Sequence, residues 1–520
     1  PGAGKTTLVA SWLDARAARG IWYQIDPGDS DLATFFHYLG QAAAPYGQKG
    51  QQQPLPALTP EYLKDVEGFS RRFFRDVFAR MPDGAVLVLD NYQEVGPEQA
   101  LHALVASAVD ELPPGIMLMA ISRRDPPATY ARLIAHERVA IVDWDQIKLT
   151  LDEARAIAGA RLCVDDAEIQ QMHERSGGWA AGLTLLLEGR RRGGPQATIL
   201  PTGLHGIFDY FAGQIFGQVP DTVQRFLVAT ALLPQVPVSI ARDLTGNERA
   251  GAILEDLYHR HLFTHRRPGA EPVYWYHALF RDFLKARADT VLGARHIGEF
   301  LSRAARLLEA AGAFDDAFEL FREATDWAAA GRLIQRRASD LLSHGRGQTL
   351  REWIQALPDE MLEEQPWLLY WLGTSLTPLN QPHAREYLER AFERFRALGD
   401  SIGQALSAAG SIDAYVFEWN DFRPVRRWVD ALDLLIDRLQ LADHPDLEQR
   451  VLSSFLLGML YVAPDHARLP WCVARVTEML DEDLEVASKF AVATRLLAYC
   501  NLTADEARAS VAAARGSTLF

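Results

Sequence analysis

The chain begins with PGAGKTT at residues 1–7, and this stretch decides how the first domain is expected to fold. Gly4, Lys5 and Thr6 match the last three positions of the phosphate-binding pattern G-x-x-x-x-G-K-[ST], whose first glycine would stand two residues before Pro1. Glycines let the backbone curl so that its N–H groups point at phosphate oxygens. On these residues alone, a chance glycine-rich turn before a helix remains the alternative.

The residue types of this loop suggest a division of labour around a bound nucleotide. Lys5 would bring a point charge to the β- and γ-phosphates, and the hydroxyl of Thr6 is a candidate Mg²⁺ ligand. Residues 6–20 are expected to form the next helix, whose N-terminus favours an anion. The candidate nucleotide-binding residues of the loop are Gly2, Ala3, Gly4, Lys5, Thr6 and Thr7.

A second part of the site is expected at the end of another strand. AVLVLDNYQEV at 85–95 begins with five apolar residues after Gly84, which indicates a buried parallel strand. Asp90 ends that strand, where open α/β sheets bind their ligands, so it is the candidate carboxylate for Mg²⁺. Taken alone, Asp90 would more simply cap the following helix, but the phosphate loop upstream favours the metal role.

Two more apolar stretches complete an alternating pattern of strands and helices. GIMLMAISR at 115–123 predicts a strand that leads to Arg123 and Arg124, and IWYQID at 21–26 predicts another. A basic residue after the first of these could sense the γ-phosphate, although a solvated loop arginine is the alternative. The alternation predicts a parallel sheet covered by helices.

Length and composition limit the remaining possibilities. At about 150 residues per domain, 520 residues predict about three domains, and 48% hydrophobic with 23% charged residues is typical of globular proteins. The net charge of −15 disfavours nucleic-acid binding through the overall field of the chain. Any DNA-binding part is therefore expected as a local patch or outside these residues.

Cysteine usage and hydropathy favour a cytoplasmic protein that does not enter a membrane. The three cysteines show no C-x-x-C spacing, so neither a disulfide framework nor a zinc site is expected. Apolar runs are too short to span a bilayer, and no signal peptide is visible. Because the chain begins with Pro1 and ends at Phe520 without an end signal, we interpret it as a fragment lacking its ends.

Several segments, taken in order, resemble the signal-transduction NTPases of the STAND class, and specifically the MalT-like regulators grouped with large LuxR-type activators. VLVLDNYQEV is similar to the Walker B strand of that family, and ISRRDPP places Arg123 as its sensor arginine. The other similar segments are PGAGKTTL, IWYQIDPGDSDLATFFHYL at 21–39, SGGWAAGL at 176–183, YHALFRDFL at 276–284 and the stretch 341–373.

The resemblance implies ATP/ADP and Mg²⁺ as cofactors and assigns roles to individual residues. It implies that Lys5, Asp90 and Arg123 are the catalytic residues, and that Thr6 and Asp90 hold the metal. It also implies that His277 approaches the β-phosphate in a closed, ADP-bound state. From the sequence alone, His277 is equally well explained as a core histidine whose hydrogen bonds are satisfied.

Two departures from the family pattern bear on activity. Asn91 replaces the second acid that often follows the Walker B aspartate, so whether the chain hydrolyses ATP, and how slowly, stays open. Ala180 replaces the family proline after Trp179, which leaves a nucleotide contact from that segment uncertain.

The expected fold is an α/β P-loop NTPase domain followed by an all-α helical subdomain, a winged helix and a TPR-like α-solenoid. Helix pairs recur after residue 290 with a period of about 35–45 residues, which is typical of tetratricopeptide-type repeats. The expected boundaries are 1–150 for the NTPase domain, 151–200 for the helical subdomain, 201–288 for the winged helix and 289–520 for the repeats.

Smaller expectations accompany these domains. Thr150 and Glu153 have capping-box spacing, residues 48–60 are expected to be a surface loop, and HRHLFTHRR at 259–267 a basic turn. Four tryptophans of the repeat region could line a ligand or protein site, but core packing is favoured for each of them: Trp353, Trp367, Trp371 and Trp419.

The leading hypothesis is an ATP/ADP-dependent switch that regulates transcription. An inducer or a regulatory protein would bind the repeats, and the ATP-bound form would self-associate and present a DNA-binding module that lies outside these residues. The alternative is a STAND-type scaffold with a protease, kinase, cyclase or other non-DNA-binding output. A metabolic P-loop enzyme such as a kinase is disfavoured, because about 230 residues are given to repeats.

Overall fold

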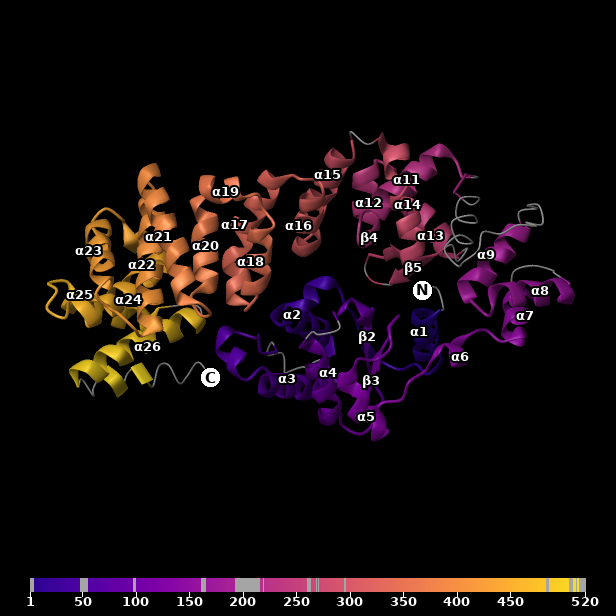
Figure 1. Cartoon of the computed structure of the whole chain (residues 1–520), viewed down its shortest axis with the longest axis horizontal. Helices are drawn as coiled ribbons and strands as arrows, with labels where there is room; N and C mark the ends of the chain where they lie inside the picture. The colour runs from indigo at the N-terminus through magenta and orange to yellow at the C-terminus, as the bar shows by residue number, and fades with distance from the viewer. Residues whose placement is uncertain are drawn as a thin grey trace. The chain divides into compact units, whose positions relative to one another are not determined.

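A computed structural model gives the fold (Figure 1). The structure describes residues 4–46, 55–96, 100–159, 165–191, 216–217, 219–259, 263–267, 269, 271–293, 296–482, 486–504, 508–510 and 512–513. The chain divides into two compact units, residues 1–56 with 64–326 and residues 57–63 with 327–520.

The first unit begins with a parallel three-stranded sheet in the order β1-β2-β3, as predicted from the apolar runs. Gln24 pairs with Asp90 at the end of β2, and Leu89 pairs with Ala120 at the end of β3, so the strands end at the same edge. β2 is the central strand, and all five of its residues are buried, as is typical of a parallel strand with neighbours on both sides. The strands are β1 (Gly20–Gln24), β2 (Val86–Asp90) and β3 (Met117–Ala120).

An aromatic core holds the helices of this part to the sheet, beginning with Tyr23 of β1 and Phe35 of α2, whose ring centroids lie 5.6 Å apart. Phe36 contacts Phe69 and Phe73 edge to face, with ring centroids 5.0 and 4.8 Å apart, so helices α2 and α3 are locked together. The helices of this part are α1 (Lys5–Ala15), α2 (Leu32–Ala43), α3 (Val66–Arg80), α4 (Leu101–Ala108) and α5 (Ala131–Ala135).

A small helical part follows, and its first long helix begins with the predicted capping box. Thr150 Oγ1 accepts from the Glu153 amide at 3.2 Å, while Glu153 Oε2 accepts from the Thr150 amide at 2.8 Å. Its helices are α6 (Trp144–Ile147), α7 (Leu151–Gly159), α8 (Asp166–Ser176) and α9 (Ala180–Arg191).

In its described residues, the winged helix combines four helices with a small antiparallel sheet in the order β4-β6-β5. The expectation of a basic turn at 259–267 was wrong for its second half, which forms β5. That stretch is a strand because Thr264 is buried and the ring of His265 stacks on Trp275 of β6. The elements are α11 (Asp221–Ala231), β4 (Val236–Pro237), α12 (Val238–Thr245), α13 (Ala250–His259), β5 (Thr264–Arg267), β6 (Val273–Tyr276) and α14 (Ala278–Lys285).

The first unit closes with the helix pair α15 (Ile297–Ala310) and α16 (Phe314–Glu323). The second unit is a stack of helices, as expected for TPR-like repeats, and its described residues include no strand. Its helices are α17 (Trp327–Ser343), α18 (Gly347–Gln355), α19 (Asp359–Glu364), α20 (Pro366–Leu376), α21 (Gln381–Leu398), α22 (Ser401–Glu418), α23 (Val425–Ile436), α24 (Pro445–Val462), α25 (Leu469–Glu478) and α26 (Val486–Thr503).

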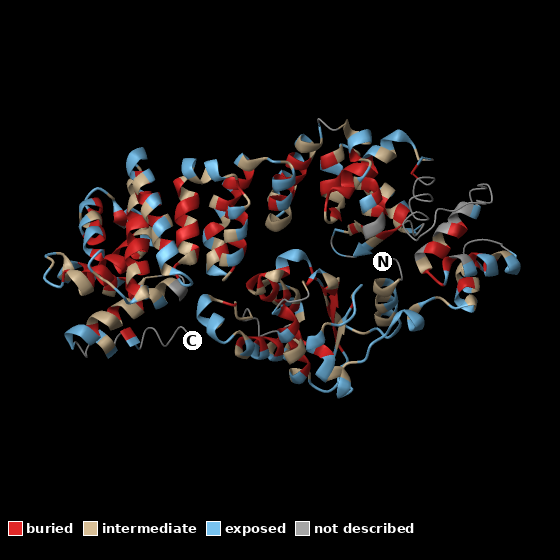
Figure 2. Cartoon of the chain, in the orientation of Figure 1, coloured by how far each residue is buried: buried red, intermediate tan, exposed pale blue. Residues whose placement is uncertain are grey.

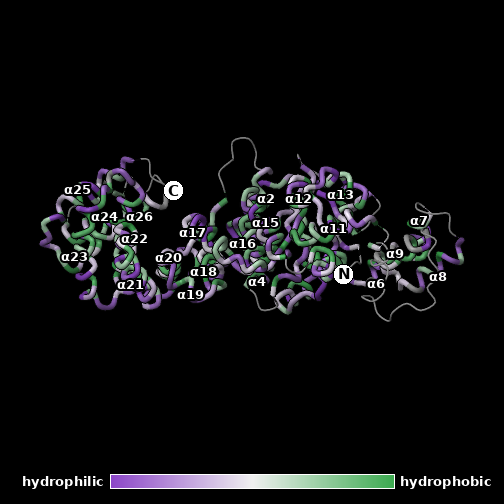
Figure 3. The backbone as a smooth tube through the Cα atoms, turned by 90° about the horizontal axis from the view of Figure 1, so that it is seen from above, coloured by the Kyte–Doolittle hydropathy of each residue, from purple (hydrophilic) through white to green (hydrophobic). Residues whose placement is uncertain are grey.

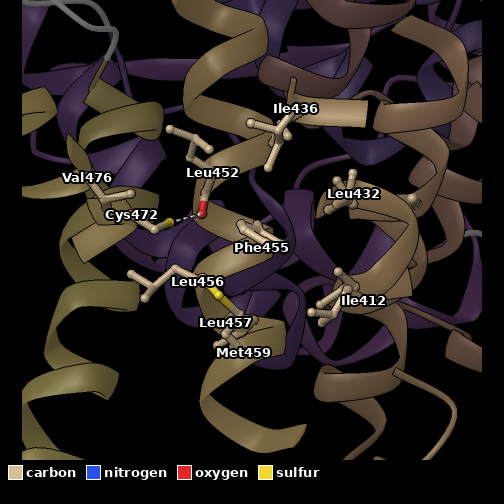
Figure 4. Close-up of a cluster of buried hydrophobic side chains, with 14 of the residues drawn as sticks. Ile412, Leu432, Ile436, Leu452, Phe455, Leu456, Leu457, Met459, Cys472 and Val476 are labelled. Carbon is tan, nitrogen blue, oxygen red and sulfur yellow. Dashed lines mark hydrogen bonds between the residues drawn. The ribbon is translucent and has the colours of Figure 1, made fainter. Parts of the chain in front are cut away.

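One continuous apolar core holds α22 to α26 together. Ile412, Leu432 and Phe455 are completely buried in it, and Figure 4 shows their side chains pointing toward one another. Figure 2 shows buried residues on the facing sides of these helices, and Figure 3 shows the corresponding alternation of hydrophobic and hydrophilic positions. Such a pattern is what stacked amphipathic helices require.

Two expectations about the repeats need correction. Residues 48–54 of the expected surface loop lie outside the described residues; the described part, 55–60, is mostly irregular, but Leu58 in it is buried, and residues 57–63 belong to the second unit. Trp353 is buried and Trp367 and Trp371 pack against a core, but Trp419 is 66% exposed and ends α22 in a left-handed conformation. Core packing is therefore wrong for Trp419.

Described helices include none that is both long enough and apolar enough to cross a lipid bilayer.

Candidate functional site

The candidate nucleotide site is built at the start of α1, where Gly4 precedes the helix. Gly4 has φ 79°, a left-handed conformation that glycine adopts without strain, and its carbonyl accepts from the Leu8 amide at 2.7 Å. Lys5 and Thr6 therefore lie in the first turn of α1, with Thr7 exposed beside them. Gly2 and Ala3 lie outside the described residues.

Thr6 and Asp90 are brought together although 84 positions separate them. The Thr6 hydroxyl lies 3.4 Å from Asp90 Oδ1, and the same oxygen accepts from the Asn91 amide at 2.8 Å. Burial raises the pKa of Asp90, while the hydrogen bonds from Asn91, Thr6 and then Trp22 oppose that rise. A role of Asp90 as a cap of the next helix would explain its hydrogen bond from the Asn91 amide, but not its contact with the Thr6 hydroxyl.

Positive charge gathers opposite this carboxylate. Burial lowers the pKa of Lys5, and the nearby Arg123 lowers it further, whereas Asp90 acts in the opposite direction. Arg123 itself is exposed after β3. Two cations, Lys5 and Arg123, therefore lie near Asp90, which suits a polyanionic ligand.

Gln93 connects the ends of the two strands, and the sequence analysis missed it. Its side-chain oxygen accepts from the Arg123 amide at 3.1 Å, and its nitrogen donates to Asn91 Oδ1 at 3.3 Å. Asn91 has φ 56°, so the chain turns sharply straight after Asp90. No spacing rule connects Gln93 to Arg123, because the bond runs between loops 30 positions apart.

Trp22 is a second residue near the site that no sequence motif indicates. It lies on β1, next to β2 in the sheet, and its side chain donates a hydrogen bond to Asp90. The tryptophan inside the IWYQID stretch was a signal available in the sequence, but its partner could be found only through the strand register.

His277 comes from the winged helix and lies within the electrostatic reach of Arg123. Its amide donates to the Phe263 carbonyl at 2.7 Å, whereas its Nδ1 atom is buried without a hydrogen-bond partner. Burial lowers the pKa of His277 to about 3, and His265 and Arg123 add to the effect. The interpretation as a satisfied core histidine is therefore wrong for Nδ1.

The helical subdomain also reaches the phosphate loop. A Cβ atom placed on Gly4 would lie 3.8 Å from the Cβ atom of Ala180. The start of α9 therefore packs directly beside the loop. Trp179 precedes it and covers Gly182, where a Cβ would come within 2.4 Å of the indole. The SGGWAAGL segment thus needs its small residues for packing, while Ala180 offers a methyl group where the family has proline.

A separate cavity lies at the other end of the sheet. It has a volume of about 580 Å³ and is lined by Trp12, Arg16, Arg19, Gly84 and Met117, among others. Gly84 precedes β2 and Met117 begins β3, so this space opens at the N-terminal ends of the strands, away from Asp90. It is therefore separate from the candidate nucleotide site.

The fold has the expected architecture of a STAND protein: a parallel sheet covered by helices, a helical part, a winged helix and TPR-like repeats. A solved STAND protein with a tetratricopeptide repeat sensor from Pyrococcus horikoshii has a similar fold, with a TM-score of 0.55 at 16% identity. The similarity covers 100% of this chain and 82% of that one.

Within that class, the predicted resemblance to MalT-like regulators is confirmed. Residues 212–296 match the family model of the MalT winged helix domain. The chain is also 26% identical over 385 residues to the HTH-type transcriptional regulator MalT of Cronobacter sakazakii. That match covers 72% of this chain and 42% of the relative, so the chain spans less than half the length of that regulator.

Proposed function

We propose that the chain is the nucleotide switch and sensor of a transcription regulator, with ADP and ATP as the ligands that set its conformation. The observation that carries this proposal is the orphaned Nδ1 of His277 near Arg123, in an electrostatic neighbourhood shared with Lys5 and Asp90. A buried polar atom without a partner is costly, and a phosphate oxygen or a water bound with it would remove that cost.

The residues of the site fit a magnesium nucleotide. Lys5 and Arg123 would hold phosphate oxygens, and Thr6 and Asp90 would hold Mg²⁺, which usually takes only one or two protein ligands beside phosphates and water. Among the described residues, no group of three or more His, Cys, Asp and Glu forms a metal cage, consistent with a shared site of this kind. The nucleotide would supply negative charge that both parts of the site recognise.

The chain's own residues suggest how binding is coupled to conformation. Gln93 fixes the backbone of Arg123, so the arginine is held where the strands end. His277 stands at the N-terminus of α14 in the winged helix, so a ligand that engages it also holds this domain against the nucleotide domain. In our proposal this closed form is the one stabilised by ADP, and ATP favours release.

The output is proposed from the relative. A regulator named for transcription shares sequence with 72% of this chain, which favours DNA control through a module beyond these residues. The repeats would receive an inducer or a regulatory protein, and the released form would self-associate. Hydrolysis would reset the switch slowly, because Asn91 offers an amide instead of a second carboxylate to the attacking water.

Nucleotide titration of three variants tests this proposal, with any natural sequence upstream of Pro1 retained. Lys5→Ala should abolish stabilisation by both ADP and ATP, whereas His277→Ala should weaken ADP more than ATP. Arg426→Ala is the matched control, because this exposed arginine pairs with Asp430 on α23 of the second unit. Equal nucleotide affinities in all three variants and the parent chain would overturn the proposed function.

A further inference from the structure

A polar centre crosses four neighbouring helices of the second unit. The helices α20, α22, α24 and α26 follow one another in one row of contacts (Figure 1). Each contributes one side chain to the centre: Tyr370, Asp413, Arg450 and Arg495. Charged groups from successive repeats meet there, on a stack whose neighbouring core is otherwise apolar.

Asp413 is the middle of this centre. It is only 2% exposed, and it forms an ion pair with Nη1 of Arg450. Its other oxygen accepts from the Ser454 hydroxyl at 3.0 Å and lies 3.7 Å from Nη2 of Arg495. A single carboxylate therefore faces two guanidinium groups.

The two arginines are not equally satisfied. Burial opposes the charge of Arg450, but Asp413 and a hydrogen bond with Tyr370 raise its pKa above the ordinary value. Arg495 makes a 3.3 Å contact with the Thr494 hydroxyl through Nη1, while its Nε atom is buried without a hydrogen-bond partner. Since arginine stays charged, the described residues of this centre carry one excess positive charge.

Such an excess is unusual for a purely structural ion pair. A buried charge is normally paired, and a buried N–H normally finds an acceptor. The chain as a whole is acidic, with 68 Asp and Glu against 53 Lys and Arg, so an unmatched guanidinium inside it is not a consequence of general composition. An acceptor with negative charge would complete Arg495.

The two arginines are partly exposed, with Arg495 at 14%, and the centre has an apolar neighbour. The side chain of Arg450 is 30% exposed. Phe417 is 48% exposed, and the centre of its ring lies 5.6 Å from the guanidinium carbon of Arg495. A ligand beside Arg495 would therefore meet charge on one side and an aromatic ring on the other.

We propose that Arg450 and Arg495, held by Asp413, form a binding site for an oxyanion, a carboxylate or phosphate group of a small effector that also covers Phe417. The planar fork of arginine matches both kinds of group, and its buried Nε supplies a donor already in place. This inference rests on the proposed function, in which the repeats sense an effector, and it names the chemistry that they would recognise.

The test uses the whole chain in a Lys5→Ala background, so that the candidate nucleotide loop does not contribute. Inorganic phosphate and acetate are titrated separately by calorimetry and by thermal unfolding, with ionic strength held constant by sodium chloride. At least one anion should bind and raise the unfolding midpoint. Arg495→Gln should weaken that binding about tenfold to hundredfold, as expected for a lost charge-assisted contact.

Arg423→Gln is the matched control, because this exposed arginine pairs with Asp421 outside the centre. Arg495→Lys keeps the charge but lacks the Nε donor, so it should bind more weakly than the parent even if Arg495→Gln folds poorly. Phosphate alone would indicate a phosphorylated effector, and acetate alone a carboxylate. Binding of neither anion, or equal binding by the Arg495 variants, overturns the site while leaving the nucleotide test unaffected.

Discussion

Two buried histidines of the first unit should respond to the same substitution with opposite signs. His277→Leu removes a buried nitrogen that lacks a partner, which should stabilise the ligand-free chain by about 1–3 kcal/mol, the usual penalty of such an atom. His102→Leu should destabilise it by a similar amount, about 1–3 kcal/mol. The reason is that His102 bonds the Tyr92 hydroxyl at 3.0 Å and the Gly96 carbonyl at 2.9 Å.

Nucleotide should reverse the order of the parent chain and the His277 variant. At a concentration 100 times its Kd, a ligand adds about 2.7 kcal/mol to the native state. The parent chain should gain that from ADP, whereas His277→Leu should gain less because the partner of the phosphate is gone. Hydrogen exchange of β6 and α14, followed with and without ADP, reports the local free energy of opening.

The same variant should also lose part of the chain's acid sensitivity. Burial holds the pKa of His277 at about 3, whereas an unfolded histidine takes up a proton near 6.5. The stability that depends on His277 is therefore complete above pH 6.5 and is lost as the pH falls toward 3. At pH 5.5 the loss should be about 1.4 kcal/mol, and it should be absent in His277→Leu. A variant that is less stable without ligand, equally stabilised by ADP and equally acid-sensitive would refute this reasoning.

Three further predictions concern other parts of the chain. Burial, and after it the charge of Asp26, raises the pKa of Asp29 to about 7. The free energy of unfolding should therefore fall by up to about 4 kcal/mol as the pH rises from about 4 to 7. Asp29→Asn should flatten this pH profile in calorimetry. Gly345 has φ 77°, and a Cβ on it would come within 1.8 Å of a backbone oxygen, so Gly345→Ala should destabilise the second unit in thermal unfolding by more than about 2 kcal/mol. Gly312 has a similar φ of 82°, but a Cβ on it would meet no atom, so Gly312→Ala should cost only about 1 kcal/mol. Gln93→Ala should lower ATP affinity several-fold while leaving the unfolding midpoint within a degree or two, because its bonds are partly exposed.

The elements near the nucleotide site could be predicted from sequence because local rules govern them. An apolar run of five residues before Asp90 gave β2, and the spacing of Thr150 and Glu153 gave a helix start. Parallel strands must end at one edge, so the neighbourhood of Asp90 and Arg123 followed from the strand pattern. Their functional roles remain predictions.

The rest depends on contacts that no local pattern encodes. The orphaned nitrogen of His277 exists only because the winged helix closes around it. Trp419 looks like its neighbours in sequence, yet it ends a helix and projects outward. Arg495 and Asp413 are 82 positions apart on different repeats, and each alone is an ordinary charged residue of an amphipathic helix.

The two candidate binding sites have one physical feature in common, although they share no motif. At the sheet edge, Lys5 and Arg123 lie near Asp90, and in the repeats Arg450 and Arg495 both face Asp413. Each place also holds a buried nitrogen without a partner, Nδ1 of His277 and Nε of one arginine. In a chain of net charge −15, such local pairs of cations oppose the overall composition. Ligand anions would relieve both, so removing one cation at a time should separate effector binding from nucleotide binding in the same molecule.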